Sequence, residues 1–168
     1  MGKYGFGFLL LLVLVAAAAC EKDDICVEGD TPLLVVEFYD VEDTSALKAV
    51  PKLRVAGVGK TVTVNTVADR TDLNRISIPL RVNRDSTSFV LISNSATNDA
   101  GEETGTLDTV HFSYVLVDTM ISRACGFIVN YKELEAALEG PNGQWIERIE
   151  VIRPLVKNSD STHVKIFH

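Results

Sequence analysis

The sequence Leu107-Asp-Thr-Val-His-Phe-Ser-Tyr-Val-Leu-Val117 carries the clearest fold signal in the chain. Large apolar residues recur in it at every second position: Val110, Phe112, Tyr114 and Leu116. A period of two is typical of a β-strand that buries one face. The segment therefore predicts a long strand, with His111 on the opposite, polar face beside Thr109 and Ser113.

Shorter segments of the same kind lie on both sides of it, separated by turn residues. They are 33–39, 53–56, 61–67, 75–82, 87–92, 125–131, 145–152 and 163–167. Segment 33–39 is nearly all apolar, as in a strand buried on both faces. Gly57-Val-Gly-Lys60 favours a hairpin that joins 53–56 to 61–67, because glycine accepts positive φ. Pro79 cannot donate a ladder hydrogen bond, which places its strand at a sheet edge or at a bulge.

One segment departs from this strand pattern. In 131–139, Leu134, Ala137 and Leu138 recur at helical spacing before Gly140-Pro141, which predicts a short helix. Many short strands with one helix in the C-terminal third indicate an all-β protein, an immunoglobulin-like β-sandwich with Greek-key connections. A closed barrel is the alternative, since periodicity does not fix strand order.

The N-terminus has the pattern of an export signal. Lys3 precedes the apolar run 6–15, and alanines 16–19 lead directly into Cys20. The run is too short to span a bilayer, which needs about 20 residues, and instead indicates a cleaved signal peptide. A cysteine at this position resembles a lipobox, although Ala17 stands where leucine or valine is usual. We therefore expect a signal peptide at 1–19, a tether at 20–30 lipidated on Cys20, and one domain at 31–168.

The residues after Cys20 indicate where in the cell envelope the protein is located. The tract Glu21-Lys22-Asp23-Asp24 resembles the acidic signal that sends Bacteroidota lipoproteins to the outer face of the outer membrane. We expect a lipid-anchored protein of the outer membrane that faces the exterior, with a periplasm-facing one as the alternative. The formal net charge is −7 without a basic cluster, which argues against nucleic-acid partners. The lipid is thus the expected membrane attachment.

Two further cysteines, Cys26 and Cys125, remain in the expected mature chain. Thiols beyond the inner membrane tend to be oxidised, so we expect a disulfide between them. A metal site that combines both thiols with histidines is the alternative. Its histidine candidates are His111, His163 and His168.

Sequence motifs of catalysis are absent. The chain contains no G-x-S-x-G, H-E-x-x-H, P-loop or G-x-G-x-x-G pattern, so we assign neither catalytic residues nor a cofactor. His111 is the only starting point for a serine hydrolase. In the acidic loop 94–105, Asp99, Glu102 and Glu103 could offer oxygen ligands to Ca²⁺. Trp145 is the best candidate for stacking on a sugar ring.

The sequence resembles a family of Bacteroidota lipoproteins of unknown function. The resemblance lies in Cys20–Cys26, Thr31–Leu33, Phe38–Asp40, Val50–Gly57, Ile78–Leu80, Thr87–Phe89 and Ser122–Phe127. It implies a paired Cys26 and Cys125 and a surface or periplasmic lipoprotein, and it supplies no activity.

These observations favour a non-enzymatic interaction or accessory module with a protein partner in the cell envelope. A small-ligand or glycan binder is the first alternative, and a hydrolase of envelope or dietary polymer is the second.

Overall fold

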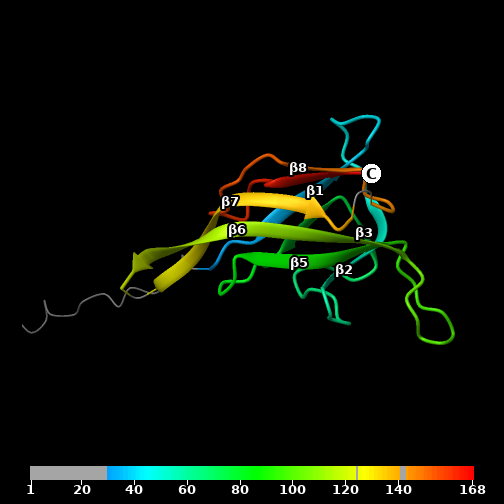
Figure 1. Cartoon of the computed structure of the whole chain (residues 1–168), viewed down its shortest axis with the longest axis horizontal. Coiled ribbons are helices and arrows are strands. Elements are labelled where there is room, and N and C mark those ends of the chain that lie inside the picture. The colour runs from blue at the N-terminus through cyan, green and yellow to red at the C-terminus, as the bar shows by residue number, and fades with distance from the viewer. Residues whose placement is uncertain (1–29, 124, 141–142) are drawn as a thin grey trace, which may run out of the picture. The chain divides into compact units, whose positions relative to one another are not determined.

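The computed structural model describes residues 30–123, 125–140 and 143–168, and these residues form nine strands (Figure 1). The chain divides into two compact units. The larger comprises Asp30–Thr119 and Ile128–His168, and the smaller includes Met120–Phe127. The expected signal peptide, Cys20, Cys26 and the tract 21–24 lie outside the described residues.

The nine strands belong to two sheets. The four-stranded sheet has the order β4-β1-β9-β8, with β4 at Arg75–Ile78, β1 at Leu34–Tyr39, β9 at Val164–Phe167 and β8 at Arg148–Val151. The five-stranded sheet has the order β3-β2-β5-β6-β7, with β3 at Thr71–Leu73, β2 at Val50–Gly57, β5 at Ser86–Ser93, β6 at Thr106–Ser122 and β7 at Gly126–Leu138.

The two sheets share one core in a sandwich-like arrangement. Val36 and Ile166 from the first sheet are buried in the same apolar cluster as Leu91 and Phe112 from the second. Strand β1 is central in its sheet, antiparallel to β4 and parallel to β9, which explains its almost uniformly apolar sequence. Strand β4 lies at a sheet edge and ends just before Pro79, as that proline predicts. The immunoglobulin-like Greek key stays a prediction.

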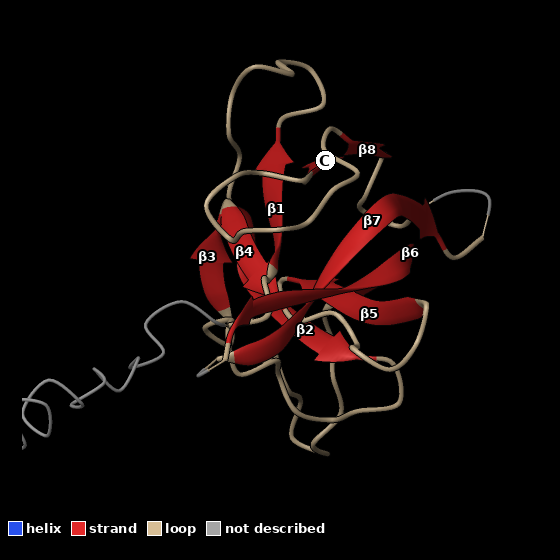
Figure 2. Cartoon of the chain, turned by 90° about the vertical axis from the view of Figure 1, so that its left-hand side faces the viewer, coloured by secondary structure: helices blue, strands red, loops and turns tan. Residues whose placement is uncertain are grey.

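The predicted helix over 131–139 is wrong, because these residues belong to β7 and its end. Figure 2 shows only strands and loops among the described residues. Glu133 has a φ of 55°, and a residue in this left-handed conformation inserts an extra position into a strand, as in a β-bulge. Tyr131 and Leu134 consequently both face the core although they are three residues apart. The helix pattern itself has another origin. Beyond Glu133, Leu134, Ala136 and Leu138 pack toward the core in strand alternation, and the four-residue spacing of Leu134 and Leu138 fits a strand and a helix alike. Nor is any helix in the described part of the chain long and apolar enough to cross a membrane.

The predicted hairpin after β2 is confirmed only at its turn. The Lys60 N–H donates to the Gly57 carbonyl, and Gly59 has a φ of 76°. The expected partner strand 61–67 is wrong, since the segment makes a single bridge, Ala56 to Thr63. Its hydroxyls bond elsewhere, Thr63 to Asp69 and Thr66 to the Ser77 carbonyl, which draws the backbone out of the ladder. Strand β2 pairs with β5 and β3 instead.

One histidine is built into the core beside β1. His163 is 1% exposed, and its Nδ1 accepts a hydrogen bond from the Val35 N–H at 3.1 Å. Burial lowers the pKa of His163 below its usual value, and the positive charges of Arg153 and Arg75 lower it further. The native state therefore keeps this imidazole neutral.

We expect acidification below about pH 6.5 to destabilise the protein through His163. The unfolded chain takes up a proton near that pH while the folded chain does not, so the stability present above it is lost as the pH falls toward the folded pKa. His163→Asn keeps an acceptor for Val35 without a titrating group. Urea midpoints at pH 7.5 and 5.5 should differ less for His163→Asn than for the wild type, and equal differences would contradict the assignment.

Candidate functional site

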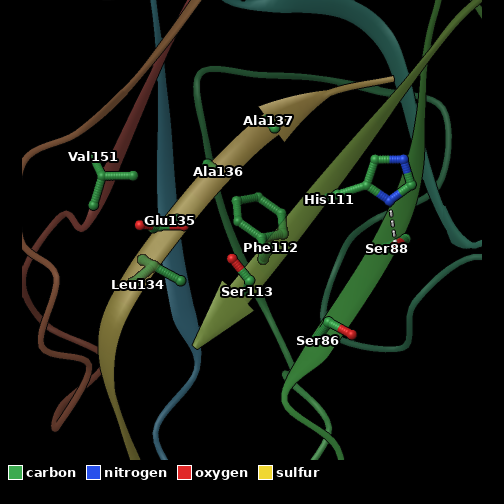
Figure 3. A pocket seen from close by; sticks show the side chains of 10 residues that line it. All are labelled: Ser86, Ser88, His111, Phe112, Ser113, Leu134, Glu135, Ala136, Ala137 and Val151. Carbon is green, nitrogen blue, oxygen red and sulfur yellow. Dashed lines mark hydrogen bonds between the residues drawn. The ribbon is translucent and has the colours of Figure 1, made fainter. Parts of the chain in front are cut away.

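The outward face of β5, β6 and β7 carries a group of polar side chains. Strand alternation places Thr87 and Phe112 in the core, so their neighbours in sequence point to the opposite face. The register of the two strands then aligns Ser88 with His111 and Ser86 with Ser113. These four residues and Glu135 of β7 line a depression of about 540 Å³ (Figure 3).

Ser88 and His111 form the one hydrogen-bonded side-chain pair in this depression that Figure 3 draws. Ser88 Oγ lies 2.6 Å from His111 Nδ1. His111 is exposed and Ser88 is half-buried. Ala136 and Ala137 of β7 also line the depression, and their small side chains leave it open. Hydroxyls and an imidazole can each donate and accept hydrogen bonds. Because Phe112, Leu134 and Val151 add apolar lining, this surface suits a ligand with both polar and apolar groups.

The Ser88–His111 pair lacks the other parts of a serine hydrolase. No carboxylate among the described residues hydrogen-bonds to His111, so nothing there would orient the ring or stabilise an imidazolium. Strand β5 is an interior strand between β2 and β6. Its backbone donors serve two ladders rather than an oxyanion hole.

The loop 94–105 holds its acidic residues in different ways. Glu103 accepts hydrogen bonds from the Ala96 and Gly105 N–H groups and from Ser95 Oγ, at 2.9–3.1 Å. It also pairs with Arg54 at 3.3 Å and Arg70 at 3.6 Å. Burial alone would raise the pKa of Glu103, but these hydrogen bonds outweigh it and lower the pKa to about 2. The carboxylate thus stabilises the loop.

The calcium candidates in this loop do not converge. Glu102 accepts a hydrogen bond from Asn98 Nδ2, whereas Glu103 faces two guanidinium groups. No three histidine, cysteine, aspartate or glutamate side chains of the described residues gather as metal ligands. For the cysteine–histidine alternative, the His163 ring bonds Val35 and the His168 ring contacts the Lys48 carbonyl. The observed partners therefore give structural roles to these groups.

Trp145 is partly buried rather than displayed. Its ring packs edge-on against His168 with centroids 5.5 Å apart and lies 6.2 Å from Phe38. The indole N–H points at the Leu91 carbonyl at 3.4 Å. These contacts favour a packing role, and glycan stacking on Trp145 stays a prediction.

Asp108 is a structural residue that sequence reasoning missed. It is 7% exposed, and its carboxylate accepts hydrogen bonds from the N–H groups of Gln144, Trp145 and Ile146 at 2.7–2.9 Å. A Cβ on Gly143 would overlap the Ile146 carbonyl oxygen, so the turn needs glycine there. Because Asp108 and residues 144–146 lie far apart in the sequence, their contact leaves no local sequence signal.

Cys125 is the one cysteine within the described residues. It is half-buried in the smaller unit, and its N–H donates to Ser122 Oγ at 3.0 Å. Its expected partner, Cys26, lies outside the described residues, so the pairing stays a prediction.

Fold and site together define an all-β protein of two sheets with a depression of mixed polar and apolar lining at β5, β6 and β7. The chain belongs to a family of unknown function, DUF6452, whose model matches residues 52–168. No curated protein and no solved structure matches the chain significantly.

Proposed function

We propose that this chain is a lipid-anchored, non-enzymatic interaction module of the outer membrane, facing the cell exterior. The export signal and Cys20 support the lipid anchor, and the tract 21–24 supports a location on the outer face of the outer membrane. A disulfide between Cys26 and Cys125 would fasten the tether to the domain, and closing a loop of about 100 residues would stabilise the fold by roughly 4–5 kcal/mol.

The observation that carries the interaction role is the depression at β5, β6 and β7, with the polar side chains that it gathers. Ser86, Ser88, His111, Ser113 and Glu135 come together there from three strands. Their hydroxyl, imidazole and carboxylate groups match a partner rich in amides or hydroxyls, which is the surface of a protein in the envelope or of a glycan. Binding at this face requires no reactive group.

Site-specific photocrosslinking in intact cells tests this role. A photoreactive residue at Ser113, in the depression, should give a discrete crosslinked product. The same photoreactive residue at Glu42, an exposed loop position far from Ser113 in the sequence, should give no product. The Ser113 product should disappear in a His111→Ala background. Equal products at both positions, or a product indifferent to His111→Ala, would refute binding at this face.

A hydrolase is the second candidate, and the 2.6 Å contact between Ser88 and His111 is the observation that favours it. We expect no covalent labelling by a fluorophosphonate probe, because His111 has no carboxylate partner in the described residues to raise its basicity. Labelling of the wild type that is lost in Ser88→Ala would establish a nucleophilic serine and reject the non-enzymatic role.

A further inference from the structure

The adjoining ends of β6 and β7, with the connection between them, display apolar side chains to solvent. We call residues Met120–Phe127 the β6–β7 turn. Met120 is 57% exposed, Ile121 37% and Phe127 70%. A single exposed apolar residue is ordinary, but three of them fall within the eight residues Met120–Phe127. Phe127 has the highest exposure of the large hydrophobic residues in the described chain. The β6–β7 turn therefore exposes three large apolar side chains within a short stretch of the chain.

The same turn carries a cation. Arg123 is exposed and makes no ion pair with any described residue. A short segment that combines aromatic and aliphatic side chains with a basic one has the composition of a membrane-interface anchor. Its apolar groups favour the acyl boundary, and its cation favours the phosphate level.

Chain length places this turn close to the lipid. The next step rests on the proposed function, in which Cys20 is acylated and Cys26 is bonded to Cys125. Six extended residues reach about 20 Å, and a disulfide adds about 6 Å between Cα atoms. Cys125 would therefore stay within about 25 Å of the lipidated residue, and it lies in the middle of the apolar turn.

We propose that the β6–β7 turn inserts into the interface of the membrane that holds the lipid anchor. Met120, Ile121 and Phe127 enter the acyl boundary, and Arg123 stays at the headgroup phosphates. The acyl chains and the turn then form two attachments, which fix the orientation of the domain as well as its distance from the membrane. The occupant of the apolar surface is lipid rather than a protein.

Tryptophan quenching in vesicles tests the insertion. The lipidated full chain is reconstituted into phosphatidylethanolamine–phosphatidylglycerol vesicles with brominated acyl chains, and Trp145 of the wild type gives the baseline. Phe127→Trp should be quenched at least twofold more than Val62→Trp, whose position is 69% exposed in the larger unit. Equal quenching of the two variants would overturn the proposal.

Two further readouts separate the causes of failure. Protection of Phe127→Trp from aqueous iodide without quenching by bromolipid would indicate a protein contact and overturn the insertion alone. The mass of the Cys20 peptide reports the anchor independently, and an unacylated Cys20 would overturn both the insertion and the proposed function.

Discussion

Replacing Asp108 with alanine is expected to lower the free energy of unfolding by about 3–4 kcal/mol. The buried carboxylate is the acceptor for three consecutive N–H groups, those of Gln144, Trp145 and Ile146. Its removal leaves donors without a partner at the edge of the core, and each buried unsatisfied donor costs about 1–3 kcal/mol. The expected loss of stability is smaller than the sum of three such penalties, because part of the turn at residues 144–146 can hydrogen-bond to water.

Urea unfolding followed by far-UV circular dichroism measures this loss, and Trp145 fluorescence reports the turn itself, because Trp145 is the only tryptophan. Asp118→Ala is the matched control. It lies on the same strand, is exposed, and its side chain makes no hydrogen bond or ion pair with a described residue, so it should change stability by less than about 0.5 kcal/mol. Similar losses in both variants would show that Asp108 does not organise residues 144–146.

Glu103→Gln is expected to destabilise the protein by about 2–3 kcal/mol at neutral pH. The amide removes the charge that faces Arg54 and Arg70, and it presents a donor where Ser95 and two N–H groups require an acceptor. The pKa of about 2 supplies an independent signature. Since the folded pKa is depressed, its stabilisation is complete above pH 4.5 and is lost as the pH falls from 4.5 toward 2.

Urea midpoints between pH 5 and 2.5 should therefore fall more steeply for the wild type than for Glu103→Gln. Glu102→Gln controls for the same loop, because Glu102 is exposed and accepts one hydrogen bond from Asn98; it should behave like the wild type. Parallel pH profiles for the wild type and Glu103→Gln would contradict the assigned network.

The strands were predictable from sequence where alternation is undisturbed. Residues 107–117 lie in β6, which buries one face and leaves the other largely polar, and residues 87–92 lie in β5, which is largely buried. The error at 131–139 has a definite origin. Leu134 and Leu138 lie four residues apart, a spacing that fits strand alternation and a helical repeat alike, so a segment this short does not separate the two.

The candidate site was predictable only in part. Alternation placed His111 on the polar face beside Ser113, but its hydrogen-bond partner Ser88 comes from β5. That pairing depends on the register between strands, which a single sequence does not encode locally. Asp108 was missed for the same reason, since its three donors are more than 30 residues away.

We propose that lipid on Cys20 holds the domain to the membrane. Mass spectrometry of the N-terminal peptide from the membrane-extracted protein tests it most directly. We predict a mature chain that begins at Cys20 and carries acyl chains on that residue. A chain that begins elsewhere, or an unmodified Cys20, would contradict this attachment.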